Sequence, residues 1–163
     1  MTTRVVLVNN AGIAAIPQDD LSDFRSVYQS VFDTNITSIG LVSSLFLQLL
    51  RHSSSPRIIN VSSGRASINN LTTSNLPPTA SVPYSISKTA LNVLTLEMAK
   101  AYPEIEFYAA NPGHCKTTFN GYRGKRDPQE GAQVAIEVAL AEKGAFKPGF
   151  WEYVDGKMGE MPW

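Results

Sequence analysis

The chain has 163 residues, of which 43% are hydrophobic and 17% charged, a composition typical of a folded globular domain. Fourteen basic and 14 acidic residues give a formal net charge of zero, which argues against nucleic acid or an anionic membrane as a partner. The single Cys115 excludes an intrachain disulfide, and with only two histidines in the chain a structural zinc site lacks ligands. We therefore expect one domain over residues 1–163, without a metal.

The first predicted element is a strand over residues 4–8, a continuous apolar run that closes in Asn9-Asn10-Ala11-Gly12. A helical stretch follows, opened by three acidic residues that suit the N-terminal end of a helix dipole: Asp19, Asp20 and Asp23. Apolar residues at helical spacing predict a helix from about residue 34 to residue 52. The Ser53-Ser54-Ser55-Pro56 segment ends it.

The second half continues the alternation of strands and helices. Its predicted elements, in chain order, are a strand over 57–61, a surface loop over 69–82, a helix over 84–102 with Ser81 as N-cap and Pro83 in its first turn, a strand over 105–110, a helix over 127–142 and a strand over 150–154 that turns at Asp155-Gly156. Alternation of this kind predicts an α/β fold with a parallel sheet and helices on both faces. Ligand sites form beyond the carboxyl ends of such strands, where Asn10, Ser63 and Pro112 fall.

The sequence gives no indication of a membrane segment. The longest apolar stretch, residues 39–50, is interrupted by Ser43, Ser44 and Gln48 and is shorter than the roughly 18 residues of a membrane helix. The apolar run near the N-terminus is shorter than the roughly 7 residues that a signal peptide needs. We expect a cytoplasmic protein that contacts no membrane.

The sharpest local feature is Tyr84-Ser85-Ile86-Ser87-Lys88, because residues four apart on a helix leave the same face. A nearby ammonium lowers the pKa of a phenol toward the range in which it serves as an acid or base. The spacing alone is weak evidence, since Tyr153 and Lys157 repeat it across a predicted turn. The basic loop residues 122–126, His114 and Cys115 have ordinary structural interpretations that we prefer.

Several motifs in one order supply the missing context. They are Asn9-Asn10-Ala11-Gly12 after a buried strand, Asn35 in the next helix, Ser62-Ser63 at a strand end, Tyr84 with Lys88, and Pro112-Gly113 with Thr117. Together they resemble the short-chain dehydrogenase/reductase family, and the C-terminal part resembles its carbonyl-reductase branch. The resemblance implies the C-terminal part of a Rossmann-type doubly wound sheet, with about four strands.

The resemblance also implies roles for these residues in hydride transfer between a nicotinamide cofactor and a carbonyl or alcohol. Tyr84 is expected to be the general acid or base, Lys88 to lower the Tyr84 pKa and bind the nicotinamide ribose, and Ser63 to hold the substrate oxygen. Asn35 is expected to position a water in a proton relay. Tyr84 and Lys88 also count as cofactor-binding residues, together with Asn10, Ala11, Gly12, Pro112, Gly113 and Thr117. NADP is the favoured cofactor, with NAD as the alternative.

The chain departs from the family pattern at its N-terminal end. The Gly-rich turn and the strand and helix units that precede the NNAG strand in the family are not in this sequence, so cofactor binding is expected to be weak or absent. The alternative to an enzyme is a truncated, non-catalytic relative that serves as an interaction domain, or an incomplete chain. The strand over 5–8 is then an exposed apolar edge, and we expect self-association through it or through the long helices. Substrate identity would depend on loops 69–82 and 119–126.

Overall fold

A single five-stranded sheet organises the molecule, in a computed structural model that describes residues 4–73 and 76–163. The strands are β1 (Val6–Asn9), β2 (Arg57–Val61), β3 (Glu106–Asn111), β4 (Phe150–Val154) and β5 (Lys157–Glu160), in the spatial order β1-β2-β3-β4-β5. The first four strands are parallel, and β5 is antiparallel to β4. The α/β class and the parallel core of the sheet are confirmed.

The fifth strand was not predicted. Asp155 and Gly156 have φ angles of 50° and 77°, the left-handed backbone that a two-residue hairpin turn requires. The sequence analysis predicted the turn but no strand after it, because Lys157-Met158-Gly159-Glu160 has little β-branched or aromatic character. Pairing with β4 supplies the stability that this segment's own propensity lacks.

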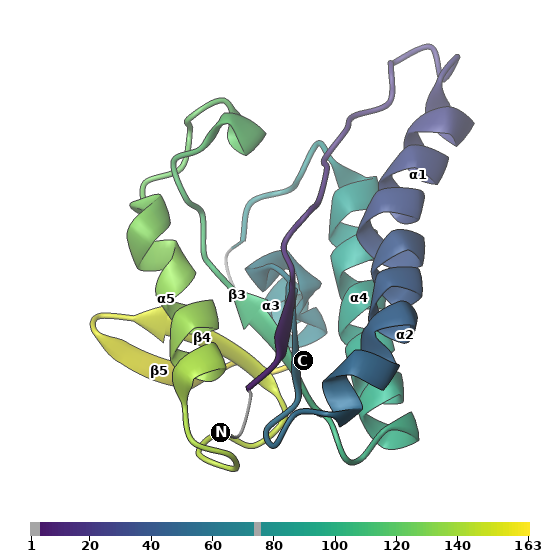
Figure 1. Cartoon of the computed structure of the whole chain (residues 1–163). Coiled ribbons are helices and arrows are strands. Elements are labelled where there is room, and N and C mark those ends of the chain that lie inside the picture. The colour runs from purple at the N-terminus through teal and green to yellow at the C-terminus, as the bar shows by residue number, and fades with distance from the viewer. Residues whose placement is uncertain (1–3, 74–75) are drawn as a thin grey trace.

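One helical segment packs beside α4 (Val82–Ala101), as Figure 1 shows. It comprises α1 (Phe24–Phe32), the π-helical turn η1 (Asp33–Thr37) and α2 (Ser38–Arg51). The remaining long helix, α5 (Pro128–Leu140), begins at Asp127, whose carboxylate accepts a hydrogen bond from the Gln129 N–H at 2.7 Å. The two faces of the sheet are therefore covered by different helices, as predicted.

Three local predictions were only partly right. Residues 69–82 are not all loop, because the short helix α3 (Ile68–Thr73) occupies the start; residues 74–75 lie outside the described part of the chain. Asp23 is the N-cap residue of α1, but its carboxylate accepts from the Gln18 N–H and that of Asp20 from the Ser22 N–H, so these side chains stabilise the preceding loop and give the helix no side-chain cap. Ser81 is the N-cap residue of α4, as predicted, but its hydroxyl donates to the Ala15 carbonyl at 2.7 Å and so gives the helix no side-chain cap.

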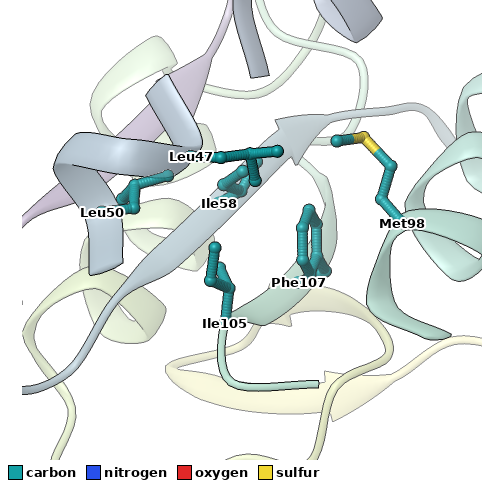
Figure 2. Packing of buried hydrophobic residues seen from close by; sticks show 6 residues of the cluster. All are labelled: Leu47, Leu50, Ile58, Met98, Ile105 and Phe107. Atoms are coloured by element: carbon teal, nitrogen blue, oxygen red, sulfur yellow. The ribbon is translucent and has the colours of Figure 1, made fainter. Parts of the chain in front are cut away.

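The core lies on both faces of the sheet. Figure 2 shows one face, where Leu47 and Leu50 of α2 and Met98 of α4 pack on Ile58 of β2 and Phe107 of β3. On the other face, Val134 and Val138 of α5 pack on Ile59 and Tyr108. Burial on both faces suits the consecutive apolar residues inside these strands, Ile58-Ile59 in β2 and Phe107-Tyr108-Ala109-Ala110 in β3.

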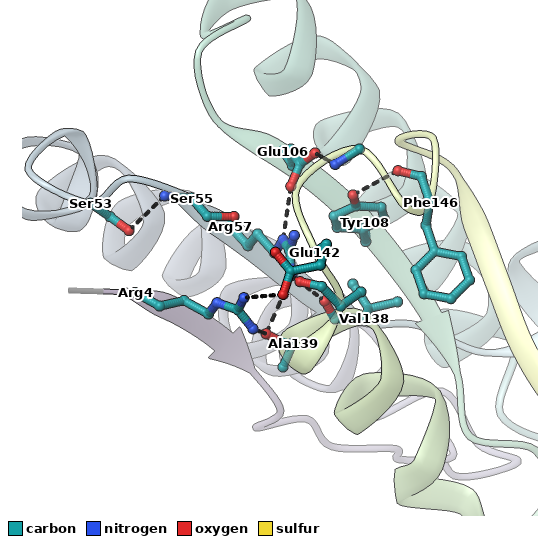
Figure 3. A network of polar contacts seen from close by, with 12 residues as sticks. Arg4, Ser53, Ser55, Arg57, Glu106, Tyr108, Val138, Ala139, Glu142 and Phe146 are labelled. Carbon is teal, nitrogen blue, oxygen red and sulfur yellow. Dashed lines mark hydrogen bonds and ion pairs between the residues drawn. The ribbon is translucent and has the colours of Figure 1, made fainter. Parts of the chain in front are cut away.

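A buried arginine at the start of β2 binds the C-terminal end of α5 (Figure 3). The Arg57 side chain is 1% exposed, and its Nε donates to Glu106 Oε2 at 2.8 Å. Its Nη1 donates to the carbonyl oxygens of Val138 and Ala141, both at 2.7 Å. Since the last carbonyls of a helix have no partner within the helix, this guanidinium satisfies them and favours the negative end of the helix dipole.

Two apolar surfaces remain open. β1 pairs only with β2 in the described sheet, and Val8 is 43% exposed, so the predicted apolar edge is confirmed. The helical segment from Phe24 to Arg51 is 28 residues long and apolar enough to span a membrane by length and composition, although 28% of the tested window is buried within the molecule. The sequence analysis judged only residues 39–50 and underestimated this helix. Core helices pass the same test, so the result does not place the segment in a membrane.

Candidate active site

The carboxyl ends of three adjacent parallel strands bring the predicted site residues to one edge of the sheet. Asn10-Ala11-Gly12 follows β1, Ser62-Ser63 follows β2, and Pro112-Gly113 follows β3. Asn10 and Ala11 are exposed, and Gly12 is half-buried. This edge is where ligands bind in sheets of this type.

Tyr84 and Lys88 lie one turn apart near the start of α4, where Pro83 suits the first helical turn. The Lys88 Nζ lies 5.9 Å from the centroid of the Tyr84 ring. Lys88 is 3% exposed and donates from Nζ to the Val61 carbonyl oxygen at 2.7 Å. Burial lowers the pKa of Lys88 from 10.5 to about 8, because the ammonium loses solvation.

Tyr84 experiences opposing effects on its pKa. Burial raises the pKa, whereas a hydrogen bond with the Ser63 side chain and the positive charge of Arg65 lower it. The sequence analysis did not identify Arg65, although it follows the Ser62-Ser63 pair by two positions. The net effect raises the Tyr84 pKa above its ordinary value, because burial is the largest contribution, so the expected lowering of this pKa is not found; a contribution of Lys88 to it stays a prediction.

The structure separates the two serines of the Ser62-Ser63 pair. The Ser62 hydroxyl is buried and donates to Asn92 Oδ1 at 2.6 Å. Ser63 is half-buried, interacts with Tyr84 and accepts a hydrogen bond from the Arg65 N–H at 3.3 Å. Ser63 is therefore the serine whose side chain lies beside the phenol.

Asn35 joins the segment after β1 to the Tyr84 helix. It lies in the π-helical turn η1 and is fully buried. Its Oδ1 accepts from the Ile13 N–H, and its Nδ2 donates to the Ile13 carbonyl and to Ser87 Oγ, all at 2.9 Å. The Ser87 hydroxyl in turn donates to the Tyr84 carbonyl at 2.7 Å. π-Helical turns inside α-helices are frequent at functional sites.

The loop after β3 is tied to the same edge by Asn111, whose role the sequence analysis did not foresee. Its Oδ1 accepts from the Gly64 and Gly113 N–H groups at 2.9 and 3.0 Å. Gly113 has a φ of 75° that disfavours other residues. Thr117 is half-buried and directly precedes the short helix η3 (Thr118–Asn120). In η3, the Phe119 ring lies 5.5 Å from the Tyr84 ring, so this loop returns to the phenol.

Other residues that the sequence singled out do not join the site. Tyr153 and Lys157 lie on β4 and β5, where they pair with Met158 and Val154 rather than with each other. His114 is exposed in its loop. Burial raises the pKa of the Cys115 thiol, which donates to the Pro112 carbonyl. Across residues 4–73 and 76–163, no cluster of three side chains could hold a metal ion.

The residues around Gly12 fit a nicotinamide group. A side-chain Cβ at Gly12 would lie 3.4 Å from both Asn35 Oδ1 and Lys88 Nζ. The lack of a side chain at Gly12 thus leaves room beside these two buried polar atoms, next to the exposed residues Asn10 and Ala11.

Comparison with known proteins agrees with this geometry. The family model for short chain dehydrogenase matches residues 3–128. A short-chain dehydrogenase/reductase of Aspergillus fumigatus is 36% identical over 178 residues, covering 97% of this chain and 66% of the relative, and the short-chain dehydrogenase anuI of Penicillium roqueforti is 32% identical, covering 92% and 62%. The chain thus spans a little under two thirds of the length of these relatives.

Solved structures show the same fold. The NADPH-bound carbonyl reductase from chicken fatty liver superimposes with a TM-score of 0.78 at 29% identity, covering 96% of this chain and 65% of that structure. The carbonyl reductase Sniffer of Drosophila melanogaster gives a TM-score of 0.78 at 23% identity, covering 97% and 66%. Fold, family model and sequence identity therefore agree that this chain belongs to the short-chain dehydrogenase/reductase family.

Proposed function

We propose that this chain carries the acid–base half of an NAD(P)-dependent oxidoreductase that interconverts a carbonyl compound and an alcohol. The observation that supports the proposal most directly is the grouping of Ser63, Tyr84 and Lys88 at one edge of the sheet, with Asn35 bonded to the same helix. A phenol, a hydroxyl and an ammonium are the groups needed to move a proton to and from a substrate oxygen.

In the direction of reduction, Tyr84 would donate its proton to the oxygen of the substrate, and the chemistry that a nicotinamide cofactor would supply is the hydride. The Ser63 hydroxyl hydrogen-bonds the same oxygen and stabilises its developing negative charge. Because burial raises the Tyr84 pKa, the phenol is protonated at neutral pH, which suits an acid. Oxidation requires the phenolate and is expected to increase with pH.

Lys88 and Asn35 have supporting roles in this proposal. Burial lowers the pKa of Lys88 to about 8, so this side chain would gain and lose a proton close to neutral pH, and its ammonium would hold the ribose of the cofactor. Asn35 holds the Ile13 backbone against α4 and keeps the Gly12 region at a fixed distance from the ammonium. The residues that would border the nicotinamide are Asn10, Ala11, Pro112, Gly113 and Thr117.

NADP is the cofactor that we propose, since the carbonyl reductase from chicken fatty liver, which is 29% identical, holds NADPH. Titration with NADPH and NADH, followed by nicotinamide fluorescence, measures binding directly. Saturable binding supports an enzyme. The absence of binding of either nucleotide would instead favour a non-catalytic relative that serves as an interaction domain.

Replacement of Tyr84 by Phe tests the assigned acid. The variant Tyr84→Phe removes one hydroxyl and is expected to abolish turnover of aldehydes while NADPH binding and the thermal unfolding midpoint stay close to those of the parent. Tyr153→Phe is the matched control, because Tyr153 also precedes a lysine, Lys157, by four residues. Turnover that survives in Tyr84→Phe would refute the proposed acid.

A further inference from the structure

The backbone of Arg65 makes hydrogen bonds to two serines of the site. It lies in the short helical turn η2 (Gly64–Ala66), and its N–H donates to Ser63 Oγ at 3.3 Å. Its carbonyl accepts from the Ser85 hydroxyl at 3.0 Å, next to Tyr84 on α4. Its charge acts on the Tyr84 phenol. The backbone of Arg65 is thus fixed next to Ser63 and to the start of α4, and its side chain is close enough to Tyr84 for its charge to act on the phenol.

The Arg65 guanidinium lacks a carboxylate partner. Within the described ranges, it makes one side-chain hydrogen bond, from Nη2 to the Pro77 carbonyl at 2.7 Å, and no ion pair. Four other arginines pair with glutamates: Arg4, Arg51, Arg57 and Arg126. The remaining two, Arg25 and Arg123, are exposed, whereas Arg65 is half-buried. A partly desolvated cation without a counter-ion favours an anion in its vicinity.

An aromatic side chain, Phe119, borders the same site. Phe119 lies with its ring centroid 5.5 Å from that of Tyr84, and it is 49% exposed. Its ring offers apolar surface to a molecule that contacts the phenol, and aromatic groups pack well on such a surface. A planar aromatic substrate with an anionic substituent matches both the ring and the guanidinium.

We infer that Arg65 is a specificity-determining residue that binds a carboxylate on the carbonyl substrate, so that the site prefers aromatic carbonyl acids to their neutral esters. The inference rests on the proposed function, because it assigns the substrate class of that site. A guanidinium has paired N–H donors that match the two oxygens of a carboxylate. Arg65 would orient the substrate with its carbonyl oxygen toward Ser63 and Tyr84.

Three pairs of substrates test the inference: 2-, 3- and 4-formylbenzoate, each compared with its methyl ester. The three positions of the carboxylate vary its distance from the aldehyde. With NADPH present, the parent chain is expected to prefer at least one acid to its ester in kcat/KM. Arg65→Gln should reduce this acid-to-ester preference by about ten- to a hundredfold, the size expected for a hydrogen-bonded charge pair.

The ratio of acid to ester isolates the role of the charge. Loss of Arg65 also acts on Tyr84, but that effect changes the turnover of acid and ester alike and cancels in the ratio. Arg65→Lys keeps the charge and should keep part of the preference. Arg25→Gln removes an exposed arginine from α1 and should leave the preference unchanged. An Arg65→Gln variant with the parent's acid-to-ester ratio would overturn the inference.

A binding measurement separates this inference from the proposed function. Benzoate is titrated into the chain without cofactor, and protein NMR signals are followed for the parent, Arg65→Gln and Arg25→Gln. Saturable binding that is lost only in Arg65→Gln supports the anion site even if no aldehyde is reduced, in which case the proposed function alone fails. Equal benzoate binding by all three chains, or none by the parent, overturns the anion site. Thermal unfolding of Arg65→Gln and Arg65→Lys checks that both remain folded.

Discussion

The buried ammonium of Lys88 is expected to destabilise the fold at neutral pH. Its pKa is about 8 in the folded chain, against 10.5 for an ordinary lysine. At about 1.4 kcal/mol per pH unit, this difference corresponds to about 3 kcal/mol of unfavourable desolvation when the group is charged. The side chain is almost completely buried, so solvent screening reduces this value little.

The sign of the pH dependence follows from which state holds the proton. Between pH 8 and pH 10.5 the unfolded lysine keeps its proton while the folded one loses it. Because the unfolded state then binds more protons, the free energy of unfolding rises as the pH rises through this range. Below pH 8 both states are charged, and the full destabilisation is present.

Replacement of Lys88 by Met removes the charge and keeps a side chain of similar length. At pH 7 the variant is expected to be more stable than the parent, by up to about 3 kcal/mol less the roughly 1 kcal/mol contributed by the hydrogen bond to Val61. Urea unfolding at pH 6.5, 8, 9 and 10 should show this advantage shrinking as the pH rises. The comparison between chains removes the contribution of the other titrating groups.

Lys100→Met provides the control, because Lys100 lies on the same helix with a side chain that is 72% exposed. Its free energy of unfolding should follow that of the parent at every pH. If Lys88→Met shows the same pH dependence as the parent chain, then the ammonium is not desolvated as the structure indicates, and the reasoning fails.

Three further predictions follow from single contacts. Ser63→Ala should lower turnover and leave the free energy of unfolding in urea unchanged. Ser62→Ala should lower that free energy by about 1–3 kcal/mol, because the buried amide oxygen of Asn92 loses its donor. Equal effects of the two variants would contradict the different roles of the two serines. Arg57→Ala should lower the free energy of unfolding by about 3–5 kcal/mol, since it leaves Glu106 without its partner, and a loss below 1 kcal/mol in urea titration would disprove this. Val8→Lys places a charge on the open sheet edge and should shift sedimentation profiles toward the monomer, while unchanged profiles would exclude this edge from self-association.

The sequence alone determined most of the parallel sheet. β2 and β4 have the predicted bounds because a short apolar or aromatic run bounded by turn residues carries its own strand signal. The relation of Tyr84 to Lys88 was also predictable, since the period of an α-helix and Pro83 in the first turn fix two residues four apart on one face. The order of the family motifs along the chain likewise identified Ser63 and Asn35 as candidate site residues.

Only the tertiary structure decided which side chains contact one another across the chain. β5 forms because β4 offers it an edge with which to pair. The carboxylates of Asp20 and Asp23 accept from loop N–H groups, so they give the following helix no side-chain cap. Arg65 and Asn111 acquire their place at the site from partners that are 12 to 47 residues away. Local periodicity reports the conformation of a segment, whereas hydrogen bonds and desolvation depend on groups that only the folded chain brings together.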